Sequence, residues 1–95
     1  MAARKSQSNG HVGATDVARR AVEQLAALTS RPVEGVLGLH RDDDGWTVTV
    51  ELVEMRRVPD STDVLATYEV ALDGHGELSG YRRTRRYYRS QVEDQ

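Results

Sequence analysis

The chain has 95 residues, a length that suits one domain built around a single hydrophobic core. It contains no cysteine, which excludes disulfides, thiolate metal sites and a cysteine nucleophile. The formal net charge of -2 conceals an asymmetry, because residues 32–80 carry eleven acids against three arginines, whereas residues 81–95 carry five arginines against two acids. No run of eighteen apolar residues or signal-peptide pattern occurs, so we expect a cytoplasmic protein that does not associate with a membrane.

A polar N-terminal segment precedes the first helical pattern. Residues 1–14 are mostly Ser, Asn, Gln, Gly and Ala, and we expect them to be a disordered tail. From Thr15 or Asp16, either of which can cap a helix, apolar residues recur at three- and four-residue steps: Ala18, Ala21, Val22, Leu25 and Leu28. Pro32 disfavours helical geometry at the residue before it, so the helix should end near Thr29 or Ser30.

After Pro32 the apolar period changes from 3.6 to 2, which indicates strands. The acidic segment 42–45 ends in Asp-Gly, a dipeptide typical of hairpin turns, and Trp46, Val48, Val50 and Leu52 then alternate with polar residues. If Asp44 and Gly45 are the two loop residues, the inward-facing pairs are Leu39 with Val50 and Leu37 with Leu52.

The rest of the chain predicts two more strands. Pro59 makes residues 56–62 a loop, a third strand follows from about 64 to 73, and the glycines of segment 73–76 supply a turn. A fourth strand, from 77 to about 88, carries Arg and Tyr in place of aliphatic residues. A three-residue turn predicts the pairs Leu72 with Leu78, Tyr68 with Arg82, Glu69 with Tyr81, and Thr67 with Arg83.

These elements predict an α+β fold, in which one N-terminal helix packs on one face of a four-stranded antiparallel meander sheet. The domain should span residues 15–90, followed by a short tail at 91–95. The helix should cover the face formed by Val48, Val50, Leu52, Val70, Leu72 and Leu78. The opposite face should carry Thr47, Thr49, Glu51, Val53, Met55, Leu65, Glu69, Tyr81, Arg83 and Arg85, and extend to Tyr87.

The segment Tyr81–Arg89 interleaves cations with aromatic rings, a combination that can grip phosphates and stack bases. In a strand, however, successive side chains point to opposite faces, so Arg83 and Arg85 should separate from Arg82 and Arg86. Carboxylates at 51, 54 and 69 can neutralise these arginines across strands. We therefore favour protein contacts, with a nucleic-acid-binding or regulatory module as the alternative.

The sequence offers no support for a catalytic, metal or cofactor site. The acidic turn at 42–44 lacks the spaced ligands of an EF-hand calcium loop. His11, His40 and His75 have no metal-ligand spacing, and no phosphate-binding glycine loop or activated nucleophile is recognisable. We expect a protein that is not an enzyme and has no cofactor.

The loop at 54–63 is long for a strand connection and is dense in both signs of charge. Its charges can simply tie down the strand ends, or they can select a partner electrostatically on a backbone that proline stiffens. Together with the Tyr and Arg residues of the fourth strand, types enriched at binding hot spots, it gives the predicted partner-binding set. That set is Glu54, Arg57, Pro59, Asp63, Glu69, Tyr81, Arg83, Arg85, Arg86 and Tyr87.

Several short motifs, taken in order, resemble the gas vesicle protein O (GvpO) family over residues 15–89. They are Gly45-Trp46, Glu51 to Glu54, Arg57-Val58-Pro59-Asp60, Asp63-Val64-Leu65-Ala66, Tyr68-Glu69-Val70, Leu72-Asp73, Gly76-Glu77-Leu78 and Tyr81-x-Arg83-x-x-Arg86-Tyr87. The resemblance implies a small cytoplasmic, non-enzymatic accessory protein that takes part in forming or regulating gas vesicles. It also implies contacts with other gas vesicle accessory proteins and with the shell protein. Both a monomer and an oligomer paired through an edge strand fit the sequence.

Overall fold

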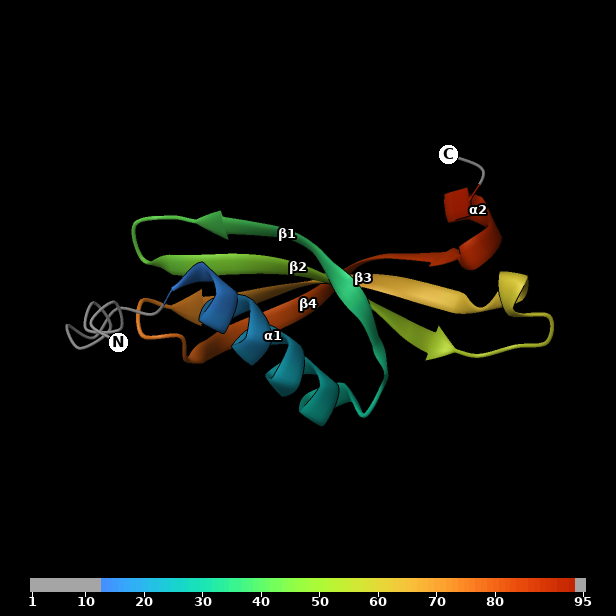
Figure 1. Ribbon diagram of the computed structural model, residues 1–95, viewed down its shortest axis with the longest axis horizontal. Coiled ribbons are helices and arrows are strands. Elements are labelled where there is room, and N and C mark those ends of the chain that lie inside the picture. The colour runs from blue at the N-terminus through green and yellow to red at the C-terminus, as the bar shows by residue number, and fades with distance from the viewer. Residues whose placement is uncertain (1–12, 94–95) are drawn as a thin grey trace.

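The computed structural model describes residues 13–93, and its backbone has the predicted α+β architecture (Figure 1). The elements in chain order are α1 (Ala14–Thr29), β1 (Val33–Arg41), β2 (Gly45–Met55), the 3-10 helix η2 (Asp60–Thr62), β3 (Val64–Asp73), β4 (Leu78–Tyr88) and α2 (Arg89–Glu93). The strands form one antiparallel sheet in the order β1-β2-β3-β4. Residues 1–12 and 94–95 of the two expected tails lie outside the described residues. The sequence did not predict α2, which includes residues 91–93 of the expected C-terminal tail, and Ala14 belongs to α1.

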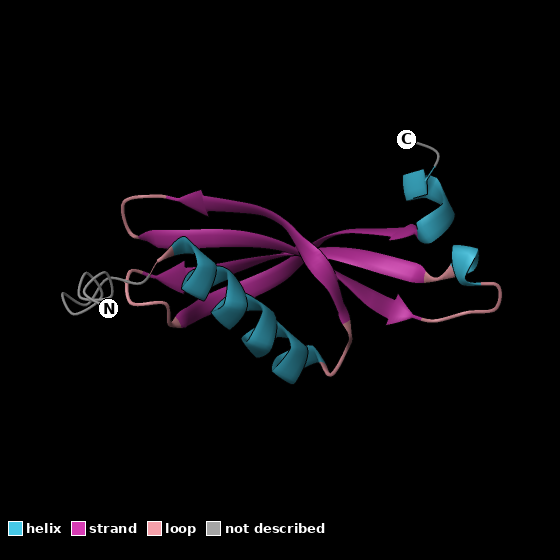
Figure 2. Ribbon diagram, viewed as in Figure 1, coloured by secondary structure: helices cyan, strands magenta, loops and turns pink. Residues whose placement is uncertain are grey.

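Helix α1 packs on one face of the sheet, here called the helix face (Figure 2). It buries Val17, Ala21 and Leu25, which are spaced four residues apart and so lie on one side of the helix. The sheet side of this core contains Val48, Val50, Leu52, Ala66, Val70 and Leu72. The predicted covered face is therefore confirmed, with Leu78 partly buried at its margin.

The helix begins earlier than the sequence predicted. Its N-cap is Gly13, so Thr15 and Asp16 lie inside the first turn, where Asp16 forms an ion pair of 2.8 Å with Arg19. The predicted C-terminal end is correct. Ser30 closes the helix in the left-handed conformation, with φ 57°, and its backbone N–H donates to the carbonyl of Ala26.

Ser30→Gly is expected to raise the free energy of unfolding by about 1 kcal/mol, because glycine adopts the left-handed conformation without the Cβ clash that serine pays. Urea unfolding of the variant beside the parent chain measures this change. Ser30→Ala serves as the control and should give no gain. A Ser30→Gly chain less stable than the parent would contradict the interpretation.

The first hairpin differs in register from the prediction. Asp42 N–H donates to the Gly45 carbonyl, so the two central turn residues are Asp43 and Asp44. The Asp42 carboxylate accepts the backbone N–H of Asp44 and of Gly45, which fixes the turn one residue earlier than expected. With two further irregularities in β1, Leu39 pairs with Val48 and Val33 pairs with Leu52. The predicted pairs of Leu37 and Leu39 are therefore wrong.

The second hairpin confirms the pair Leu72 with Leu78, but its register then shifts twice, between Ala71 and Leu72 and between Thr67 and Tyr68. Each shift marks a β-bulge, in which β4 contributes one extra residue against β3. The pairs become Val70 with Tyr81, Glu69 with Arg82, Tyr68 with Arg83, Thr67 with Arg85, Ala66 with Arg86 and Leu65 with Tyr87. The three pairs predicted beyond Leu78 are wrong for this reason.

The molecule is elongated, with extents of 48 × 26 × 26 Å. Both hairpin turns lie at the end where α1 begins, whereas the β2–β3 connection and α2 lie together at the opposite end (Figure 1). We call this second end the distal end. Among the described residues α1 covers a single face of the sheet, and we call the opposite face the uncovered face.

Candidate functional site

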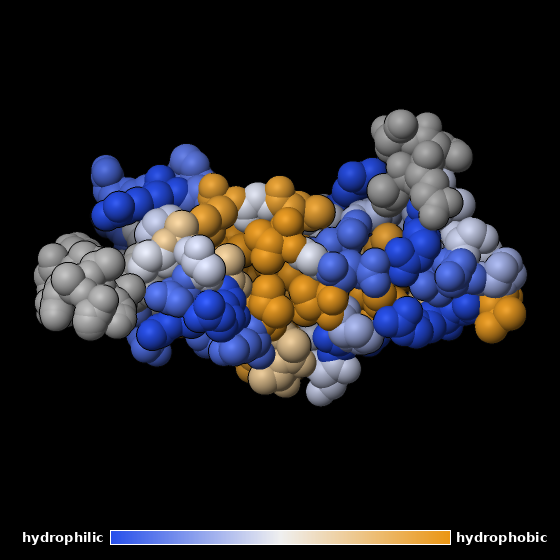
Figure 3. Space-filling model, viewed as in Figure 1, coloured by the Kyte–Doolittle hydropathy of each residue, from blue (hydrophilic) through white to orange (hydrophobic). Residues whose placement is uncertain are grey.

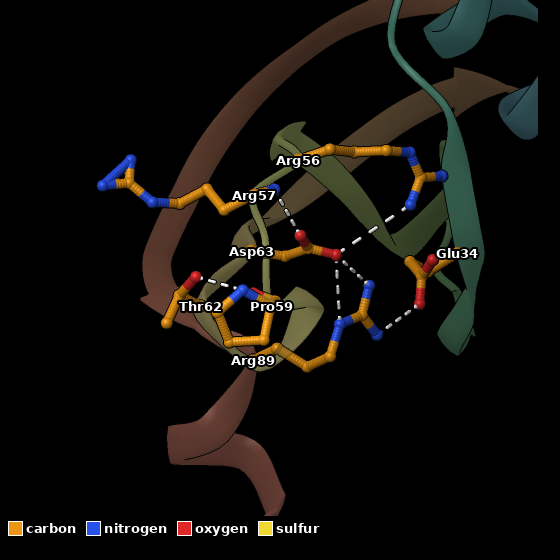
Figure 4. A network of polar contacts seen from close by, with 7 residues as sticks. All are labelled: Glu34, Arg56, Arg57, Pro59, Thr62, Asp63 and Arg89. Atoms are coloured by element: carbon orange, nitrogen blue, oxygen red, sulfur yellow. Dashed lines mark hydrogen bonds and ion pairs between the residues drawn. The ribbon is translucent and has the colours of Figure 1, made fainter.

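The Asp63 carboxylate organises the distal end (Figure 4). Its side chain is 1% exposed, and Oδ1 accepts the backbone N–H of Arg57 at 2.7 Å. Oδ2 accepts two bonds from the Arg89 guanidinium, at 3.0 Å from Nη2 and 3.3 Å from Nε. Arg89 Nη1 also donates to Glu34 at 3.0 Å, so this one carboxylate links the β2–β3 connection to α2 and, through Arg89, to β1.

These contacts keep Asp63 and Arg89 ionised. The backbone N–H of Arg57 is the main cause that lowers the pKa of Asp63, aided by the Arg89 guanidinium, while burial acts in the opposite direction. Hydrogen bonds to Glu34 and Asp63 raise the pKa of Arg89. Burying a carboxylate destabilises a fold unless its oxygens accept hydrogen bonds, and the Asp63 carboxylate accepts three. Asp63 therefore holds the β2–β3 connection in place against α2.

The loop itself is closed by local hydrogen bonds. The Val58–Pro59 peptide bond is cis, and the Pro59 carbonyl accepts both the backbone N–H and the hydroxyl of Thr62, at 3.1 and 2.7 Å. Asp63 N–H donates to the Asp60 carbonyl at 2.9 Å. While these bonds face inward, Val58 is 99% exposed and the Arg57 side chain points away from Asp63 (Figure 4).

On the helix face, Glu54 binds two arginines of β4. Its carboxylate lies 3.0 Å from Arg83 Nη1 and 3.1 Å from Arg86 Nε, and its side chain is 9% exposed. Tyr81 lies on the same face, with its ring 6.1 Å from that of Tyr68. The sequence placed Tyr81 and Arg83 on the uncovered face, and the β-bulges of β4 reverse that placement.

The uncovered face carries a different set of β4 residues. Arg82 forms a 3.0 Å ion pair with Glu69, and the Arg85 guanidinium stacks 4.4 Å above the Tyr87 ring. The sequence grouped Arg85 with Arg83, whereas the register places Arg85 with Arg82 and places Arg83 with Arg86. Met55 pairs with Val64 after an irregularity in β2, so it also leaves the predicted face.

Tyr87 is 7% exposed and packs with Val53 and Leu65 as a second small core on the uncovered face. Its hydroxyl donates to Glu51 and lies 3.4 Å from the hydroxyl of Thr67. Burial is the main cause that raises the pKa of Tyr87, and the Glu51 carboxylate adds to it. Tyr87 is therefore a packing residue, in contrast to the exposed contact that the sequence suggested.

The predicted site residues accordingly form three groups. The β2–β3 connection contains Arg57, Pro59 and Asp63. The helix face carries Glu54, Tyr81, Arg83 and Arg86. The uncovered face carries Glu69, Arg85 and Tyr87. The expected neutralisation of arginines is confirmed for Glu54 and Glu69, whereas Glu51 accepts a hydrogen bond from the Tyr87 hydroxyl instead. Sequence reasoning missed the roles of Arg89 and Glu34, because the residues of this network are 26 and 55 positions apart in the chain.

Apolar side chains remain exposed where α1 and the edge strand β1 meet. Figure 3 shows hydrophobic residues gathered over the middle of the view that faces α1 and β1. The exposed apolar residues of these two elements are Leu28, Val36, Leu37 and Leu39, with exposed fractions of 40–57%. Leu37 and Leu39 were expected to be buried. Leu39 does pair with the core residue Val48, but it lies on the edge strand and stays 40% exposed, and Leu37 lies at an irregularity of β1.

Within residues 13–93, no three histidine or carboxylate side chains converge as metal ligands would. The helices of the same part of the chain are too short or too polar to cross a membrane. An open depression of about 400 Å³ lies at the distal end of β4, and its lining residues are Val64, Arg86, Tyr87, Tyr88 and Gln91.

Comparison with known proteins identifies relatives along nearly the whole chain. The family model described as "Gas vesicle synthesis protein GvpO" matches residues 1–93. "Gas vesicle protein O" of Streptomyces sp. (strain CB03234) is 58% identical over 73 residues, which cover 77% of this chain and 57% of that protein. "Gas vesicle protein O1" of Halobacterium salinarum is 37% identical over 76 residues, covering 80% of this chain and 64% of the relative.

A third relative, "Gas vesicle protein O" of Haloferax mediterranei, is 35% identical over 85 residues, covering 88% of this chain and 61% of the relative. The chain thus spans 57–64% of the length of these relatives. No solved structure matches it. On the family model and these three relatives, the chain belongs to the gas vesicle synthesis protein GvpO family.

Proposed function

We propose that this protein is a cytoplasmic, non-enzymatic accessory protein for gas vesicle assembly or its regulation. It works through contacts with other gas vesicle proteins, both accessory proteins and the shell protein. Family membership supports the pathway, since the family and the three relatives carry gas vesicle names. The exposed apolar side chains of α1 and β1 support a binding role.

The observation that carries the binding role is the exposed apolar cluster of Leu28, Val36, Leu37 and Leu39 beside an edge strand. Contiguous exposed apolar side chains favour association, and an edge strand offers backbone groups for pairing. The carboxylates of Glu54 and Glu69, in contrast, are already paired with arginines of β4. We therefore expect the charged residues to contribute to partner specificity more than to affinity.

Nucleic-acid binding is the second candidate, favoured by the exposed arginines of β4. It receives less support from the geometry because Arg82, Arg83, Arg86 and Arg89 each pair with a carboxylate. The same carboxylates would face an approaching phosphate backbone and repel it.

The test removes the gene from a strain that forms gas vesicles and restores it on a plasmid. Electron microscopy should reveal few or no vesicles without the gene and normal vesicles after it is restored. Transcript levels of the shell gene separate the two roles, because an assembly factor leaves them unchanged and a regulator alters them. Normal vesicle numbers in the deletion strain would refute the proposal.

A further inference from the structure

We infer that residues 56–59 form a recognition tip that inserts Val58 into an apolar pocket with an acidic rim on a partner protein. This inference rests on the proposed function for the choice of partners, which are other gas vesicle proteins. The tip consists of Arg56, Arg57, Val58 and Pro59, and we call it the distal tip.

Val58 lies at the apex of the distal tip, exposed to solvent. A valine that is 99% exposed gains nothing from the fold of its own chain, since burial of apolar area is what makes such a side chain favourable. Arg56 and Arg57 precede it and are exposed as well. Figure 3 shows an isolated hydrophobic spot among hydrophilic residues at the end of the molecule where Figure 1 places the β2–β3 connection.

Hydrogen bonds hold the β2–β3 connection in one shape before any partner binds. The backbone N–H of Arg57 is bound by Asp63, and the Pro59 carbonyl is bound twice by Thr62. A loop fixed in advance loses little conformational entropy on binding, so more of the contact energy appears as affinity. The loop buries its charged anchor, Asp63, and leaves its apolar apex in water, an arrangement that suits recognition by a partner better than it suits self-stabilisation.

The charge of Arg57 indicates the chemistry of the partner. Glu54 and Asp63 each lie within ion-pair distance of two arginines, namely Arg83 with Arg86 and Arg56 with Arg89. The Arg57 guanidinium donates to the sulfur of Met55 at 3.3 Å, a neutral acceptor, and no carboxylate within residues 13–93 forms an ion pair with it. A carboxylate rim on the partner would supply the missing counter-charge.

A protein partner fits this tip better than a nucleic acid does. The apex of the tip is an aliphatic side chain, which neither stacks on bases nor binds phosphate. Asp60 follows immediately after Pro59 and would oppose a phosphate at the same position.

The experiment measures binding of the full chain to each of the other gas vesicle proteins of the same organism, produced one at a time. Wild type should bind at least one of them, more tightly at low salt than at high salt. The double variant Arg57→Glu with Val58→Asp should bind that protein at least about tenfold more weakly. Arg57→Gln and Val58→Asp, made singly, should each give part of the loss.

The matched control is Arg19→Glu with Thr15→Asp, which makes the same change in charge at exposed positions near the start of α1, away from Leu28. It should bind like wild type, and circular dichroism should show the same folded spectrum for both double variants. Equal affinity of the tip variant and wild type would overturn the inference, and so would a wild-type chain that binds none of these proteins. A mixed-sequence DNA duplex and a single-stranded RNA are tested in parallel, and tip-dependent binding to either in place of protein would also overturn it.

Vesicle yield distinguishes this inference from the function on which it rests. If the tip variant restores normal vesicle numbers to the deletion strain, the recognition tip is refuted and the assembly role stands. If the deletion itself leaves vesicle numbers unchanged, the assembly role is the part that fails.

Discussion

Asp63→Asn is expected to lower the thermal midpoint by several degrees and to free the β2–β3 connection from α2. The asparagine can still accept the backbone N–H of Arg57, but Arg89 loses the charged partner that binds it through two nitrogens. Removing one member of a buried ion pair leaves the other uncompensated, which is the costly way to break such a pair. Thermal unfolding and amide hydrogen exchange of residues 56–63 measure the two effects.

The effect of this substitution should depend on pH. Hydrogen bonds and arginine charges hold the pKa of Asp63 below its ordinary value of 3.8 in the folded chain. Its stabilising contribution is therefore complete above that ordinary value and is lost as the pH falls through the lower folded pKa. The gap in stability between the parent and Asp63→Asn should be widest near neutral pH and should close under strong acid.

Two observations check this prediction. Asp60→Asn is the control, since Asp60 is an exposed carboxylate of the same loop, and it should leave the thermal midpoint nearly unchanged. A stability gap between the parent and Asp63→Asn that stays constant from neutral pH to strong acid would contradict the ionic role. Asp73 also has a lowered pKa, from the backbone N–H groups of Glu77 and His75, so some acid sensitivity should persist in the variant.

Leu25→Ala is expected to lower the free energy of unfolding by about 2–5 kcal/mol. Leu25 is 0% exposed and lies between α1 and the sheet, so its truncation removes buried methyl groups and opens a cavity in the main core. Domains of this size are only marginally stable, so a loss at the upper end of the range would leave much of the chain unfolded. Urea unfolding followed by far-UV circular dichroism measures the loss.

The matched control is Leu28→Ala, one helical turn further along α1. Leu28 is 52% exposed, so the same substitution should cost less than about 1 kcal/mol. Similar losses for the two variants would mean that α1 does not bury the face described here. If the exposed apolar cluster binds a partner, Leu28→Ala should instead reduce vesicle yield without a comparable loss of stability.

The sequence by itself determined the type and order of the main elements. Apolar residues repeat every 3.6 positions in a helix and every 2 positions in a strand, because one side of each element is buried. This repeat can be read from a short stretch of sequence. This is why the end of α1, the limits of β3 and the core face of Val48, Val50 and Leu52 were predicted correctly. The pairing of β4 arginines with Glu54 and Glu69 also followed from charge alone.

The tertiary structure decided which side of the sheet each β4 residue occupies. A β-bulge adds one residue and reverses the alternation beyond it, and no residue type in segment 78–88 marks where the extra residue goes. Tyr81 and Arg83 therefore lie on the helix face, and Arg82 lies beside Glu69, where the sequence had predicted Tyr81. The Asp63–Arg89–Glu34 network likewise joins segments far apart in the chain, and only the packed sheet brings them within hydrogen-bond distance.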